Sequence, residues 1–168
     1  MTISRLVDRE VRRNVKVSDD DVKEYLKPNS LPAEGKFYRI TQAYFKLPTE
    51  DNVEETKQKI SKFMAEANAG VNFRELSARY SESAIADNGG DMGYIHESKL
   101  SDEFRHAVQD LKPGDVSRPF QSPMGVHIIK LEDVRTPQQM VEAERFEAAY
   151  RDWLRAMRED ALIEVRLN

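Results

Sequence analysis

The sequence predicts an α+β fold, in which helices surround a small and mainly antiparallel β-sheet. Residues 37–47 alternate between two faces as a β-strand does, and residues 126–134 are predicted to form a second strand. Between them, residues 53–69 and the segment that begins at Phe73 repeat their apolar side chains at helical spacing. The resulting order of strand, two helices, strand, helix and strand is typical of a domain whose helices lie against an antiparallel sheet.

Two short helices are expected before the first strand, followed by a linker. Residues 2–16 carry four apolar side chains at helical spacing, with arginines between them: Ile3, Leu6, Val7 and Val11. Ser18 is placed to begin the second helix, because its hydroxyl can accept a hydrogen bond from the backbone N–H of Asp21. Proline, asparagine and glycine recur over residues 28–35, where a boundary between two lobes is therefore expected.

Capping and turn residues separate the elements of the central region. Gly70 can end the helix of residues 53–69 in a left-handed conformation, and Asn72 can cap the helix that follows. Residues 88–90 then interrupt the chain before a short strand over residues 92–95.

A third helix is expected to begin at Ser101 as its N-cap. Its apolar side chains share one face that is expected to point inward: Phe104, Ala107, Val108 and Leu111. The segment that follows, residues 112–115, has proline and glycine where a type II turn requires them.

A long helix is expected after the last strand. Thr136 is a suitable N-cap, Pro137 suits the first helical position, and Gln139 stands at the third. Bulky side chains then form a stripe along one side of the helix: Phe146, Tyr150, Trp153, Met157 and Ala161. Because such a stripe is unstable in water, this helix must dock on another element, and the N-terminal helices are the nearest candidate.

Composition excludes several classes of function. The net charge of −4 and the isoelectric point of about 5.5 give no electrostatic reason to expect binding to nucleic acid. The absence of cysteine excludes disulfides, thiolate metal sites and a cysteine nucleophile. No apolar run approaches the roughly 18 to 20 residues that cross a bilayer, and residues 1–5 lack the apolar core of a signal peptide.

The remaining glycines and histidines do not form a recognisable site. Gly89, Gly90 and Gly93 do not follow the strand-to-helix pattern of a phosphate-binding loop, so they are expected to serve turns and close packing. His96 and His106 lack metal-ligand partners at a suitable spacing, and both are expected at the surface. No Ser-His-Asp set can be assembled from the sequence.

Four blocks of sequence stand in a distinctive order. They are F-R-E-L-S-A-R-Y-S-E-S from Phe73, N-G-G-D-M-G from Asn88, F-R-H-A-V-Q-D-L-K-P-G-D-V-S from Phe104 and G-V-H-I-I-K-L from Gly125. Together they resemble the parvulin class of peptidyl-prolyl cis-trans isomerases, and the flanks resemble those of SurA/PpiC-type bacterial foldases. The resemblance implies three parts: a helical flank that forms a chaperone-like lobe, a parvulin-type isomerase domain, and a C-terminal helix that packs with the flank. Their ranges are residues 1–35, 36–134 and 135–168.

The resemblance implies isomerisation of X-Pro bonds without a metal, a cofactor or a covalent intermediate. The positions that hold the proline ring in this class correspond to apolar residues here: Met92, Leu100 and Phe104. Met124 is expected to join them in binding the substrate, at a position where the class usually has a polar or aromatic residue. The alternative for Met92, Leu100 and Phe104 is that they are simply core residues. Val126 and Ile128 are expected to belong to the core.

The resemblance also implies a polar network beneath the substrate amide. His127 matches the histidine of the last strand, which orients the amide more than it transfers protons, and Ser122 matches a hydroxyl residue that shares this network. Gln42 stands where the first strand typically has a histidine, and it can form hydrogen bonds but carries no charge. Ser83 stands where aspartate or cysteine is typical and is neutral at pH 7. These two departures predict low or selective turnover.

The resemblance implies unfolded or proline-containing polypeptides as partners, with no nucleic acid and no membrane insertion. It also implies a periplasmic or exported location, with this chain as part of a longer exported protein. Two other functions stay open: a non-catalytic chaperone or peptide-binding module that uses the same groove, and a structural or dimerising module built on the C-terminal helix. The sequence does not determine the clients or the oligomeric state, and a dimer is one of the open possibilities.

Overall fold

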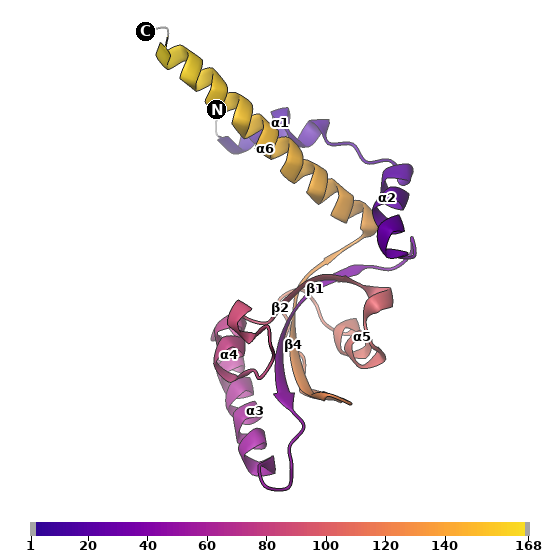
Figure 1. Cartoon of the computed structure of the whole chain (residues 1–168), viewed down its shortest axis with the longest axis vertical. Helices are drawn as coiled ribbons and strands as arrows, with labels where there is room; N and C mark the ends of the chain where they lie inside the picture. Colours follow the sequence, from indigo (N-terminus) through magenta and orange to yellow (C-terminus); the bar gives the residue numbers. More distant parts are fainter. Residues whose placement is uncertain (1–2, 167–168) are drawn as a thin grey trace. The chain divides into compact units, whose positions relative to one another are not determined.

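The structure is a computed structural model that describes residues 3–166, with the side chains of residues 4–160. The contributions expected from Ile3 and Ala161 to helix faces therefore lie outside the described side chains. The chain divides into two compact units. Gly35–Val134 forms one of them, and the segments that precede and follow it form the other (Figure 1).

A four-stranded sheet forms the centre of the Gly35–Val134 unit. Its strands are β1 (Phe37–Lys46), β2 (Asp91–His96), β3 (Phe120–Ser122) and β4 (Gly125–Arg135), in the order β2-β1-β4-β3. β2 pairs with β1 and β3 pairs with β4, both antiparallel, so the predicted α+β fold with a mainly antiparallel sheet is confirmed. β3 was not predicted from the sequence, because a strand of three residues is too short to show alternation.

Helices cover both faces of this sheet (Figure 1). α3 (Val53–Asn68) and α4 (Phe73–Tyr80) lie on one face, over a buried cluster that includes Ala43, Phe45, Phe63, Phe73, Leu76 and Ile128. α5 (Asp102–Gln109) lies on the other face, over a second buried cluster that includes Ile40, Leu100, Val108 and Ile129. The two faces predicted for the first strand are thus confirmed, because Ile40 belongs to one cluster while Ala43 and Phe45 belong to the other.

The predicted caps and turns of this unit are largely confirmed. Asn72 Oδ1 accepts hydrogen bonds from the backbone N–H groups of Arg74 and Glu75 at the start of α4. Gly70, with φ +88°, ends α3 in the left-handed region. Ser101 does occupy the N-cap of α5, but its side chain makes no capping hydrogen bond, so that part of the prediction is wrong.

Gly90 shows why a glycine is needed before β2. Its φ of +77° lies in the left-handed region, and a Cβ there would meet the carbonyl of Gln42 and the hydroxyl of Ser77. The backbone N–H of Gln42 donates to the Gly90 carbonyl at 2.9 Å. Gly90 therefore combines a turn with a close approach of two backbones, as expected from the sequence.

The second unit is helical. It contains α1 (Ile3–Glu10), α2 (Asp19–Leu26) and α6 (Pro137–Arg166), with short 3₁₀ turns over Arg12–Asn14 and Lys27–Asn29. The first helix is shorter than predicted because the chain leaves the α-helix after Glu10, whose carbonyl accepts a hydrogen bond from the side chain of Asn14 at 2.8 Å. The predicted N-caps are present, with Ser18 capping α2 and Thr136 capping α6.

Aromatic side chains form a ladder along α6. Phe146 stacks on Tyr150 with ring centroids 6.0 Å apart, and Tyr150 stacks on Trp153 at 5.9 Å. The guanidinium of Arg12 lies 5.2 Å from the centre of the Phe146 ring. All three rings are half-buried, whereas Met157 on the same helix is exposed.

Replacing Phe63 with alanine is expected to destabilise the protein strongly. The Phe63 ring is fully buried and makes edge contacts with Phe45, Phe73 and Tyr80, so its removal leaves a large cavity. We expect a loss of about 3–5 kcal/mol in the free energy of unfolding, measured by urea denaturation. The exposed neighbour Lys62 provides the control, and Lys62→Ala should change stability by no more than about 0.5 kcal/mol. Equal effects of the two variants would contradict this assignment of the core.

Candidate functional site

A cleft of about 560 Å³ opens on the face of the sheet that carries α5. Its lining includes all four residues expected to bind the substrate, together with two members of the expected polar network: Met92, Leu100, Phe104, Met124, Ser122 and His127. Lys99 and Glu103 bring the only charged side chains to this lining among the described residues. The cleft is therefore an apolar slot with polar groups at a few positions.

Four different elements position these side chains. Met92 comes from β2 and Phe104 from the first turn of α5, while Leu100 precedes α5 and is only 6% exposed. Met124 lies in the loop between β3 and β4 and is 74% exposed. Leu100 thus serves the core and the cleft together, whereas Met124 forms an exposed apolar lip of the cleft.

An aromatic cluster surrounds His127 at the base of the cleft. The Phe104 ring meets the His127 ring edge-on at 5.0 Å and the Phe120 ring at 5.2 Å, and Phe120 stacks on His127 at 5.5 Å. His127 itself is only 6% exposed. The imidazole is therefore held among rings that leave it little freedom to rotate.

His127 has a hydrogen bond on one ring nitrogen only. Its Nε2 lies 2.8 Å from the hydroxyl oxygen of Ser122, whereas its buried Nδ1 has no hydrogen-bond partner. Burial lowers the pKa of His127 below the ordinary value of 6.5, although the carboxylate of Glu103 opposes this effect. The imidazole is consequently neutral at neutral pH, where it can orient a polar group by a hydrogen bond.

Tyr44 is a site neighbour that the sequence analysis missed. Its ring lies 5.2 Å from that of His127, and its hydroxyl donates to the backbone carbonyl of Met124 at 2.7 Å. Alternation along residues 37–47 puts Tyr44 on the same face as Ile40 and Gln42, and this was the signal available in the sequence. Tyr44 therefore ties the loop that carries Met124 to the central strand β1.

Gln42 and Ser83 do not line the cleft. Both backbone polar groups of Gln42 are hydrogen-bonded. Its carbonyl accepts from the Ser77 hydroxyl at 2.7 Å, and its N–H donates to the Gly90 carbonyl. The Ser83 hydroxyl accepts from the backbone N–H of Ile85 at 3.3 Å. Their membership of a network with His127 stays a prediction.

The expectation that His96 lies at the surface is wrong. Its side chain is buried, with 3% exposed, because it ends β2 with its ring edge-on to Phe37 at 4.9 Å. Its Nδ1 lies 2.8 Å from the Ser98 hydroxyl. His106 is exposed as expected. Within residues 3–166, no group of three or more histidine, aspartate or glutamate side chains could hold a metal ion.

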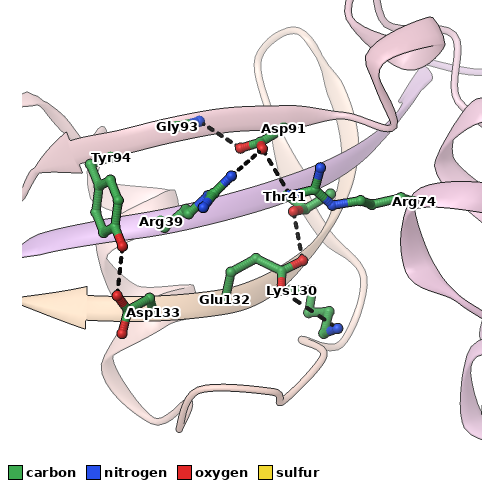
Figure 2. Close-up of polar contacts among 9 residues, drawn as sticks. All are labelled: Arg39, Thr41, Arg74, Asp91, Gly93, Tyr94, Lys130, Glu132 and Asp133. Carbon is green, nitrogen blue, oxygen red and sulfur yellow. Dashed lines mark hydrogen bonds and ion pairs between the residues drawn. The ribbon is translucent and has the colours of Figure 1, made fainter. Parts of the chain in front are cut away.

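An ionic clamp fixes the start of β2, where Met92 lies. Figure 2 shows the guanidinium groups of Arg39 and Arg74 converging on one oxygen of Asp91, each at 2.8 Å, while the other oxygen accepts from the Gly93 N–H at 2.9 Å. The hydrogen bond from Arg39 is the main reason why the pKa of Asp91 falls to about 2. Because Arg39 lies on β1 and Arg74 on α4, the clamp joins three elements.

Two further contacts tie β1 and β2 to β4 (Figure 2). The buried hydroxyl of Thr41 on β1 donates to Glu132 at 2.8 Å, and the Tyr94 hydroxyl on β2 donates to Asp133 at 2.6 Å. Together with the clamp, they hold β1, β2 and β4 in register, so that Met92 and His127 face the same cleft.

The comparison with protein families identifies the central unit. A model described as "Rotamase: PPIC-type PPIASE domain" matches residues 39–133. A solved structure of a PpiC-type peptidyl-prolyl cis-trans isomerase domain is 28% identical, with a TM-score of 0.55. The similarity covers 62% of this chain and 96% of that structure.

Two curated relatives extend the comparison. Chaperone SurA of Ralstonia nicotianae is 37% identical over 110 residues, which is 59% of this chain and 22% of that protein. Foldase protein PrsA of Oceanobacillus iheyensis is 32% identical over 142 residues, which is 84% of this chain and 43% of that protein. The chain thus spans less than half the length of these relatives. In the described part of the chain, no helix is long and apolar enough to cross a membrane.

Asp91→Asn is expected to lower stability and to flatten its acid dependence. Because the folded-state pKa of Asp91 lies below its ordinary value of 3.8, its contribution is complete above about pH 4 and is lost as the pH falls toward 2. We expect a loss of about 1–2 kcal/mol at pH 7, allowing for the partial exposure of both arginines. Urea denaturation between pH 2 and 7 measures it. Exposed Asp110→Asn is the control, and an equal effect there would refute the clamp.

Glu103→Gln is expected to lower the pKa of His127 further. The Glu103 carboxylate favours the charged imidazole, so its removal leaves the effect of burial unopposed. NMR titration of the His127 ring between pH 4 and 8 measures the pKa directly. Asp102→Asn removes a neighbouring charge on the same helix and should have a smaller effect. A raised or unchanged pKa in Glu103→Gln would show that the carboxylate does not act on His127.

Proposed function

Because residues 39–133 match its model, the chain belongs to the family of PpiC-type peptidyl-prolyl isomerase domains, and we propose that it catalyses cis-trans isomerisation of X-Pro bonds. The observation that carries this proposal is the apolar cleft, in which Met92 and Phe104 stand beside His127. A slot of this kind suits a proline ring, which is compact and apolar. The substrate would be a proline-containing stretch of unfolded polypeptide.

The reaction requires no bond to be made or broken. Rotation about the X-Pro bond is opposed by amide resonance, and uncatalysed interconversion takes tens to hundreds of seconds. A protein accelerates the rotation by binding the twisted amide more tightly than the planar one. In the proposed complex the apolar lining holds the ring fixed, while the remainder of the peptide rotates relative to it.

His127 is proposed to orient the substrate amide instead of transferring protons. The lowered pKa keeps the imidazole neutral at pH 7, and Ser122 holds its Nε2. The buried Nδ1 has no hydrogen-bond partner among the described residues, so one hydrogen-bonding position of the ring is left unused. We propose supporting roles for Gln42 and Ser83 in the same network.

We propose that the clients are unfolded proteins outside the cytoplasm, in the periplasm or beyond. This rests on relatives named chaperone SurA and foldase protein PrsA. In this proposal the helical flanks form a lobe that receives client segments, and residues 36–134 act on the proline. The half-buried rings of Phe146, Tyr150 and Trp153 would offer such a lobe an aromatic surface.

A second candidate function is peptide binding without catalysis in the same cleft. The observation that favours it is that Gln42 and Ser83 are not part of the cleft lining, while the Nδ1 of His127 has no hydrogen-bond partner among the described residues. Exchange NMR on a proline-containing peptide separates the two functions. Faster cis-trans exchange in the presence of the protein supports the isomerase. Shift changes without faster exchange would support the binding module, and neither effect would contradict both.

Two substitutions are expected to separate turnover from binding. His127→Ala should lower the isomerisation rate roughly 10- to 100-fold with a smaller effect on peptide affinity, because it removes an orienting group. Phe104→Ala should weaken peptide binding and also lower stability, because its ring walls the cleft and packs on Phe120. Exchange NMR and fluorescence titration measure the two quantities. The exposed Gln109→Ala on the same helix is the control, and unchanged turnover in His127→Ala would contradict the proposed role.

A further inference from the structure

Strand β3 leaves one edge of the sheet open. It stands last in the order β2-β1-β4-β3 and pairs only with β4 among the described strands. An open strand edge presents backbone N–H and C=O groups that another extended chain can bind. The question is therefore which groups of β3 face this edge.

The pairing register answers this question. Ser122 and Gly125 are partners across a loop of two residues, so they must be a pair that exchanges both backbone hydrogen bonds. Bonded and non-bonded pairs alternate along an antiparallel ladder, which makes Gln121 and Val126 a non-bonded pair. The N–H and C=O of Gln121 consequently point away from β4, and the residue is exposed.

A second cleft, of about 730 Å³, runs beside this edge. One side is formed by α5 and the residues just after it, including His106 and Asp110. The other is formed by Arg118, in the chain that leads into β3, and by Gln121 of β3 itself. This second cleft is lined by acidic and basic side chains as well as apolar ones, whereas the lining of the first cleft is mostly apolar. It can accept an extended backbone with varied side chains.

The two clefts adjoin. Glu103 lines both of them, and the wall between them contains the contact of Phe104, which lines the first cleft, with Phe120, which lines the second. Phe120 also stacks on His127. A polypeptide whose proline occupies the first cleft therefore has a continuous path past Glu103 to the open edge of β3.

We propose that the edge of β3 and the second cleft bind the residues that flank the target proline, as an added strand paired with the backbone of Gln121. This inference rests on the proposed function, because its ligand is the same polypeptide chain. Recognition by backbone hydrogen bonds depends little on sequence, so many different flanking segments fit. The proline would then be selected by the first cleft and the extended conformation by the second.

Peptides of two lengths test this proposal. The short peptide has four residues with a central X-Pro bond and blocked ends, and the long peptide extends it by three residues on each side. A third peptide has the long sequence with N-methylated flanking residues, which cannot form the ladder. Wild-type protein should bind the long peptide about tenfold more tightly than the short one, as expected for two or three backbone hydrogen bonds. The N-methylated peptide should bind like the short one.

Gln121→Pro and Gln121→Ala form a matched pair of variants. Proline removes the outward N–H without breaking a bond to β4, whereas alanine removes only the side chain. Calorimetry measures the dissociation constants of the short and the long peptide in each variant, and the first is divided by the second. A change in the first cleft that weakens both peptides equally does not alter this ratio. The ratio should stay near tenfold in Gln121→Ala and fall to about twofold in Gln121→Pro.

The outcomes are distinct. Equal affinity of wild-type protein for short and long peptides, with normal turnover of both, would overturn the added strand and leave the isomerase proposal intact. A tenfold ratio of dissociation constants in Gln121→Pro would also overturn it. If Gln121→Pro changed only the self-association of the protein, the edge would be assigned to a second copy of the chain and the proposal would again be overturned. If neither peptide binds or isomerises, the proposed function fails and this inference fails with it.

Discussion

The burial of β4 on both faces is the constraint on which the rest of the central unit depends. Ile128 is fully buried in the cluster beneath α3 and α4, and Ile129 is fully buried in the cluster beneath α5. Because side chains alternate along a strand, a shift of one residue would exchange the two faces. His127 therefore has to lie on the α5 face, at the base of the cleft. The same register leaves the backbone of Gln121, on the neighbouring strand, pointing outward.

Burial also determines the chemistry available to His127. Packed against Phe104 and Phe120, the imidazole loses contact with water, and its pKa falls. A neutral ring bound to Ser122 can orient an amide but is poorly suited to hold a positive charge. This suits a rotation about a bond, which needs shape and hydrogen bonding and no proton transfer. The clamp at Asp91 supports the site from the other face of the sheet by fixing β2.

The sequence was sufficient to predict the elements that have strong local patterns. Alternation identified β1, capping residues located α2, α4 and α6, and the resemblance predicted the lining from Met92 to His127. Local sequence patterns could not predict the contacts between residues that are distant in the sequence. The clamp of Arg39 and Arg74 on Asp91, and the approach of Tyr44 to His127, depend on strand register. His96 was misplaced because its burial arises from the end of β2 meeting Phe37, which no local pattern shows.

The most direct test of this site is to locate the proline ring in the complex. Intermolecular NOEs between the ring protons of a proline-containing peptide and isotope-labelled protein would identify the side chains in contact. The proposed function predicts NOEs to the methyl group of Met92 and to the ring of Phe104. NOEs only to Phe146, Tyr150 and Trp153 on α6 would contradict it, because the peptide would then bind to the helical unit and not to the cleft beside His127.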